Sequence, residues 1–127
     1  MAAGDKTYLE SDGKAVNVTL TATVKKDQLV VVEGWVGIAG SDGVSGEQIA
    51  LSVDNREYQI TVPAALAVAK GAIIYITLAS IVGHTIQDAG YVTAPAAGTV
   101  AVFKATSAKD ANQVVTGIMI AAGALAS

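Results

Sequence analysis

The chain has 127 residues, of which 52% are hydrophobic, with no cysteine and a formal net charge of −3. This length predicts one domain that folds without covalent cross-links, and the lack of cysteine excludes a disulfide framework and a thiolate metal site. The acidic balance argues against nucleic-acid binding, which needs clustered Lys and Arg, and no apolar run reaches the ~20 residues of a membrane-spanning helix.

The N-terminal stretch 1–14 has no periodic apolar face, because Tyr8 and Leu9 are its main apolar anchors. We expect an extended N-terminal arm at residues 1–14 and a single β domain at 15–127. Such an arm either frays or adds to the sheet of another chain. The same stretch lacks the basic and apolar regions of a secretory signal, so we expect synthesis and use without secretion.

The next segments read as strands. Apolar and hydroxyl residues alternate over Val16–Thr23, which is the period of a strand with one buried face. After a turn at Lys25–Asp27, the continuous run Leu29–Val32 predicts a strand that is covered on both faces. A short strand at Trp35–Ala39 follows, and the glycines after it are expected in turns.

A central stretch from Glu47 to Leu78 combines two alternating segments with a dense apolar run. The polar residues Asp54–Arg56 interrupt the alternation and indicate either a tight hairpin or a bulge in one long strand. Pro63 ends the second segment because it cannot donate a ladder hydrogen bond. The alanine-rich segment Ala64–Lys70 then predicts one or two turns of helix, followed by a strand over Ala72–Leu78.

The rest of the chain continues the β pattern. We expect Ile86–Ala97 to be a connection with one edge strand, Thr99–Ala105 to be a clear strand and Val114–Ile120 to be the closing strand. The fold class is therefore all-β, as a small β-barrel or sandwich with one short helix and the extended N-terminal arm.

The sequence carries no catalytic signature. It has no phosphate-binding loop, and Ser41 and Ser45 lack the glycine pattern of a nucleophile elbow. The lone His84 has no partner at a useful spacing, so we expect a loop or surface histidine. We predict no catalytic, cofactor-binding or metal site, no cofactor and no enzymatic activity. Trp35, the single tryptophan, is expected in the core or at a subunit interface.

Several segments together resemble a family of small tailed-phage proteins, the capsid decoration or cement proteins. The likeness lies in the Lys25–Asp27 turn, the block VVVEGWVGIAGSDGVSG at residues 30–46, the strand and proline of Ile49–Pro63, and Lys70-Gly71 with the strand after it. Members of this family often carry a recombinase-like label, which this short, acidic chain without a phosphate loop contradicts. The chain departs from the family in its longer Val82–Pro95 connection and its alanine-rich tail.

The resemblance implies a structural virion protein, made in the host cytoplasm, that binds the outer surface of a phage head and stabilises contacts between major capsid proteins. It also implies a small β-barrel that is often a homotrimer. On this hypothesis the arm residues Asp5, Lys6, Thr7, Tyr8 and Leu9 contact the capsid, and Trp35 lies near a subunit or capsid interface. The alternative is a ligand- or glycan-binding β-module on a virion or cell surface, and a β-rich nucleotide hydrolase comes third.

Overall fold

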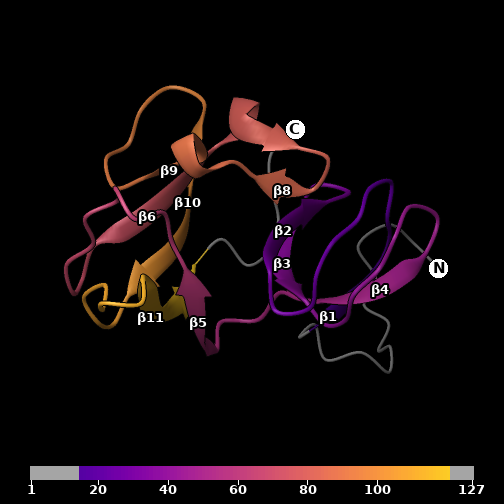
Figure 1. Cartoon of the computed structure of the whole chain (residues 1–127), viewed down its shortest axis with the longest axis horizontal. Helices are drawn as coiled ribbons and strands as arrows, with labels where there is room; N and C mark the ends of the chain where they lie inside the picture. Colours follow the sequence, from indigo (N-terminus) through magenta and orange to yellow (C-terminus); the bar gives the residue numbers. More distant parts are fainter. Residues whose placement is uncertain (1–14, 121–127) are drawn as a thin grey trace, which may run out of the picture.

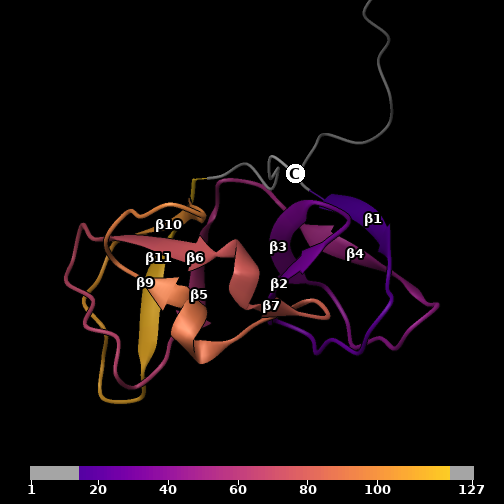
Figure 2. The same cartoon turned by 90° about the horizontal axis from the view of Figure 1, so that it is seen from above.

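The computed structural model describes residues 15–120 of the chain. These residues form two antiparallel sheets that are arranged like a sandwich and do not close into a barrel. Figures 1 and 2 show the two sheets side by side, joined by several connections. The all-β class is therefore confirmed, and of the two architectures that the sequence left open the structure takes the sandwich.

The first sheet has six strands and the second has five. The strands of the first sheet are, in spatial order, β1 (Ala15–Thr19), β4 (Gln48–Ser52), β3 (Trp35–Ala39), β2 (Leu29–Val32), β8 (Thr85–Ile86) and β7 (Ile81–Val82). Those of the second sheet are β5 (Glu57–Thr61), β11 (Val114–Met119), β10 (Thr99–Ala105), β6 (Ile73–Thr77) and β9 (Tyr91–Val92). Two short 3-10 turns, η1 (Leu78–Ser80) and η2 (Asp88–Gly90), lie at crossings between the sheets.

Strand β2 takes part in two hydrophobic clusters. Leu29 and Val31 point into the larger cluster, which fills the space between the two sheets. Val30 and Val32 point the other way, into a second cluster built from the first sheet and the Leu20–Val24 segment. This alternation confirms that the Leu29–Val32 strand is covered on both faces, because successive side chains of a strand point to opposite sides.

The Asp54–Arg56 segment is neither a hairpin nor a bulge. Strand β4 before it pairs with β1 and β3 of the first sheet, whereas β5 after it pairs only with β11 of the second sheet. The segment therefore carries the chain from one sheet to the other. Both sequence interpretations assumed that the flanking strands share a sheet, and local alternation does not reveal a change of sheet.

The predicted helix at Ala64–Lys70 is wrong. The segment has a turn after Pro63, where the Leu66 N–H donates to the Pro63 carbonyl at 3.1 Å, and then runs on without helical structure. Its carbonyl groups find distant partners, because the Lys109 ammonium donates to the carbonyls of Ala64, at 2.8 Å, and Leu66. Val68 is buried in the larger cluster. These long-range contacts outweigh the helical propensity of alanine.

The first sheet bends until the free edge of β1 approaches the β2–β3 turn and the β7–β8 turn. There the backbone N–H of Thr19 donates to Glu33 Oε1 at 3.3 Å, and the N–H of Thr21 donates to His84 Nε2 at 2.9 Å. Glu33 lies in the two-residue β2–β3 turn, where its φ of 53° and the φ of 80° at Gly34 fit a type I′ hairpin. In a closed barrel, backbone hydrogen bonds would join β1 to another strand at this edge. Here the side chains of Glu33 and His84 make the contacts instead.

Candidate functional site

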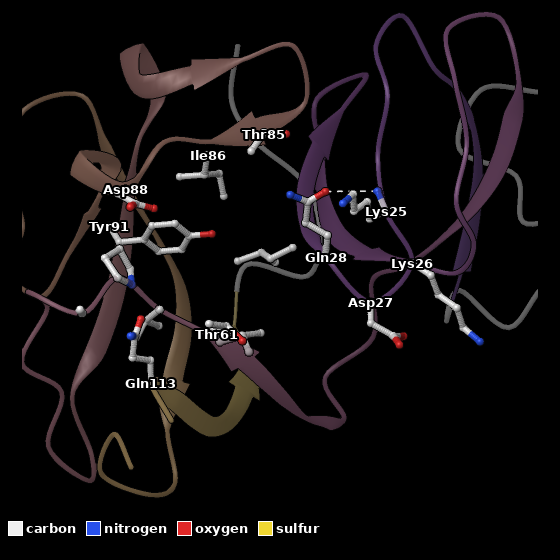
Figure 3. Close-up of a pocket in the computed structure, with 15 residues that line it drawn as sticks. Lys25, Lys26, Asp27, Gln28, Thr61, Thr85, Ile86, Asp88, Tyr91 and Gln113 are labelled. Atoms are coloured by element: carbon white, nitrogen blue, oxygen red, sulfur yellow. Dashed lines mark hydrogen bonds between the residues drawn. The ribbon is translucent and has the colours of Figure 1, made fainter. Parts of the chain in front are cut away.

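A groove of about 530 Å³ lies between the two sheets. Its apolar side is formed by Leu29, Ile60, Val62, Pro63, Ala64 and Ile86, and its polar side chains are Lys25, Lys26, Asp27, Gln28, Thr61, Thr85, Asp88, Tyr91 and Gln113. These residues come from β2 and the turn before it, from β5 and the residues after it, from the β8–β9 segment, and from Gln113 just before β11 (Figure 3). The groove is therefore assembled from segments that are far apart in the sequence.

Tyr91 extends its hydroxyl group into the groove (Figure 3). Burial raises the pKa of this phenol to about 12, and the nearby Asp88 carboxylate contributes to the increase. The tyrosine follows η2, where a side chain at Gly90 would clash with Ser80 because its Cβ would lie 2.7 Å from the Ser80 Cβ. Close packing of η1 on η2 thus sets the position from which Tyr91 enters the groove.

Gln28 lies on the opposite wall of the groove. Its Oε1 accepts a hydrogen bond from the Lys25 N–H at 3.3 Å, which leaves the amide nitrogen directed toward the groove (Figure 3). Lys26 and Asp27 are exposed, and Figure 3 shows both side chains directed away from the groove. The groove therefore presents neutral hydrogen-bonding groups more than charge.

A second polar cluster lies where the chain first crosses between the sheets. The Tyr58 hydroxyl donates to Asp54 Oδ1, and Arg56 Nε forms an ion pair with Asp54 Oδ2 at 2.6 Å. Oδ2 is buried, and its contact with Arg56 lacks hydrogen-bond geometry. Burial raises the pKa of Tyr58, and its hydrogen bond to Asp54 raises it further. The Arg56 guanidinium also lies 5.7 Å from the centre of the Tyr58 ring. The three side chains therefore stabilise the segment that connects β4 to β5.

The outer face of the second sheet carries apolar side chains that no other described segment covers completely. Lys104 is paired with both Ile73 and Ile118, so these residues form a row across β6, β10 and β11. Ile118 is 37% exposed and Ile120 is 38% exposed. Tyr75 and Val92 are paired on the same face and are half-buried. Sequence reasoning did not single out this face, although its strands were predicted.

His84 occupies the two-residue turn between β7 and β8. It was predicted as a loop or surface histidine, but its side chain is only 7% exposed. Nε2 accepts the hydrogen bond from the Thr21 N–H, so the proton lies on Nδ1, which donates to the Val31 carbonyl at 3.0 Å. Both ring nitrogens therefore hold structure together, and neither faces a groove or a candidate substrate.

The other predicted residues have different outcomes. Trp35 is the first residue of β3; it is half-buried and packs against the second cluster, away from the groove lining. The arm residues Asp5, Lys6, Thr7, Tyr8 and Leu9 lie outside the described residues. Within residues 15–120, no three acidic or histidine side chains gather closely enough to hold a metal ion. No helix in that range is long and apolar enough to cross a membrane.

The chain matches a known protein family. A family model described as phage cement protein matches residues 10–121. Neither a curated protein nor a solved structure matches the chain. The match begins before β1 and includes all the described strands. The chain therefore belongs to the phage cement protein family.

Proposed function

We propose that this protein binds the outer surface of a phage capsid and stabilises contacts between major capsid proteins. The match to the phage cement protein family over nearly the whole chain carries this proposal, since that family has a structural, capsid-associated role. A structural role also fits a chain with no catalytic signature and with no metal-binding cluster in residues 15–120.

Residues 1–14 form the proposed arm, and Asp5, Lys6, Thr7, Tyr8 and Leu9 are its proposed capsid contacts, while residues 15–127 form the proposed β domain. An extended segment adds to a neighbouring sheet through backbone hydrogen bonds, so it tolerates variation in the surface that it meets. Deletion of Met1–Leu9 is expected to leave the β domain folded and to weaken head binding. Unchanged binding by the deleted protein would remove the arm from the proposal.

The outer face of the second sheet is the proposed contact surface within the described residues. Ile118 and Ile120 are partly exposed, and covering them with a capsid protein would stabilise the complex, because apolar burial contributes ~25 cal/mol per Å². Ile118→Glu places a charge on this face and is expected to weaken head binding. Val82→Glu is the matched control, because Val82 is 65% exposed but belongs to the first sheet.

The direct test is co-sedimentation of the purified protein with expanded heads that lack it. Recovery in the head fraction, together with greater resistance of the heads to heat, supports the function. Failure of the wild-type protein to sediment with heads would refute the function, whereas unchanged binding by Ile118→Glu would refute only the assigned face.

We also propose that the protein is a homotrimer with Trp35 near an interface. A multivalent trimer converts later contacts on a shell into intramolecular ones, so modest contacts give a long residence time. Sedimentation equilibrium measures the oligomeric state. Trp35 is the single tryptophan of the chain, so its fluorescence reports its burial. An emission that changes neither when the oligomer is diluted to monomers nor on binding to heads, after subtraction of the emission of heads alone, would argue against the interface.

A further inference from the structure

We propose that the groove between the two sheets is a binding site for a small neutral sugar. The inference goes beyond capsid binding and does not depend on it. Its volume of about 530 Å³ lies within the range of small-ligand sites, and it joins an apolar floor to a few convergent polar groups.

The hydrogen-bonding groups of the groove match the chemistry of a sugar. Gln28 and Gln113 each carry an amide that both donates and accepts, and Thr61 and Thr85 carry hydroxyl groups. The Tyr91 hydroxyl also donates and accepts. Sugar hydroxyls do the same, so a ring with neighbouring hydroxyls can satisfy several of these groups at once. The buried carbon atoms of Leu29 and Ile86 provide a floor for the C–H face of such a ring.

Two of these groups are already oriented before a ligand arrives. The Lys25 N–H donates to Gln28 Oε1 at 3.3 Å, so the side-chain amide nitrogen of Gln28 is directed toward the groove. The packing of η1 on η2 fixes the position of Tyr91 on the opposite wall. Figure 3 shows the Tyr91 hydroxyl and the Gln28 amide facing each other across the opening. Groups that are held in place before binding lose little freedom when the ligand binds.

The charges around the groove favour a neutral ligand. Two lysines and two aspartates line it, so its net charge is zero. Lys26 and Asp27 are directed away from it in Figure 3, and Asp88 sits beside Tyr91. A phosphate or sulfate group would find no cluster of cations there, and an apolar ligand would leave the phenol and amides without partners.

The test uses the full-length protein and a panel of glucose, galactose, mannose, N-acetylglucosamine, lactose and maltose. Each sugar is titrated to millimolar concentration while amide and side-chain NMR signals are recorded. We expect saturable shifts that are centred on Gln28, Thr85 and Tyr91 for at least one sugar. Trp35 fluorescence is a poor readout, because this residue packs against the other cluster.

Matched variants decide whether the groove is the site. Tyr91→Phe and Gln28→Ala are each expected to weaken sugar binding about 3- to 10-fold, as expected for the loss of one hydrogen bond. Tyr75→Phe and Gln59→Ala, which remove the same groups outside the groove lining, are expected to leave it unchanged. Thermal unfolding confirms that all four variants fold.

Two outcomes would overturn the inference: no saturable shift with any sugar, or equal binding by the wild-type protein and all four variants. Because the experiment contains no capsid, failure here leaves the capsid-binding proposal intact. Conversely, if the protein failed to bind heads, the sugar-binding proposal would still stand, because the sugar titration uses the free protein.

Discussion

Replacement of His84 tests how strongly a buried side chain holds the first sheet together. In His84→Ala, the Thr21 N–H and the Val31 carbonyl both lose a partner, and the volume of the ring is left empty. A net hydrogen bond contributes about 1 kcal/mol, and a buried group left unpaired costs about 1–3 kcal/mol. We therefore expect the free energy of unfolding to fall by roughly 2–4 kcal/mol, out of the ~5–15 kcal/mol typical of a domain.

Urea unfolding followed by circular dichroism measures this loss, and amide exchange at Thr21 shows whether the bond itself is broken. His84→Gln is the matched variant, because its amide both donates and accepts at a similar reach and is expected to recover about half of the loss. If the free energy of unfolding of His84→Ala stayed within about 0.5 kcal/mol of the wild type, or if exchange at Thr21 did not accelerate, the two hydrogen bonds of His84 would not hold the first sheet together.

Three further predictions follow from local geometry. Gly117→Ala places a Cβ 2.4 Å from both the Lys104 carbonyl oxygen and the Phe103 ring, so we expect a loss of roughly 3 kcal/mol or more in urea unfolding; a loss below about 1 kcal/mol would show that the sheet yields easily. The half-buried Tyr91 phenol, with its pKa of about 12, keeps its proton in the folded state while an unfolded chain releases it near pH 10, so stability falls as pH rises from about 10 to 12. In an absorbance titration, Tyr91→Phe should remove the tyrosine that titrates near pH 12, while the raised titration of Tyr58 stays; an unchanged titration curve would contradict the assignment. A double-mutant cycle with Asp54→Asn and Tyr58→Phe should give a coupling energy of about 1 kcal/mol, and strict additivity would mean that the crossing cluster does not act as a unit.

Much of the strand content could be predicted because strand periodicity is a local signal. The predicted strands Leu29–Val32, Trp35–Ala39 and Thr99–Ala105 coincide with β2, β3 and β10. The continuous β-branched run of β2 even indicated burial on both faces. Val16–Thr23 was predicted too long, because β1 ends at Thr19, where the chain turns toward His84.

The features that sequence reasoning missed depend on contacts between distant residues. The irregular path of Ala64–Lys70 depends on Lys109, some 40 positions later, so alanine propensity alone favoured a helix. The buried environment of His84 depends on Thr21 and Val31, which lie 63 and 53 positions before it. No local pattern signals either contact.

The groove could not be predicted for the same reason. Its lining comes from four separate parts of the chain, and residues such as Gln28, Tyr91 and Gln113 are unremarkable in their local sequence. Turn residues and single polar side chains between strands are ordinary features of a β protein. Only the packing of the two sheets brings them to one opening.

The side chains that bridge the open end of the first sheet also affect how the protein behaves at high concentration. An edge strand with free N–H groups is a template for pairing with other chains, and β1 is such an edge among residues 15–120. Glu33 and His84 occupy the N–H groups of Thr19 and Thr21 along this edge. Loss of either side chain therefore opens a site for intermolecular strand pairing, and its first sign is expected to be lower solubility at high protein concentration.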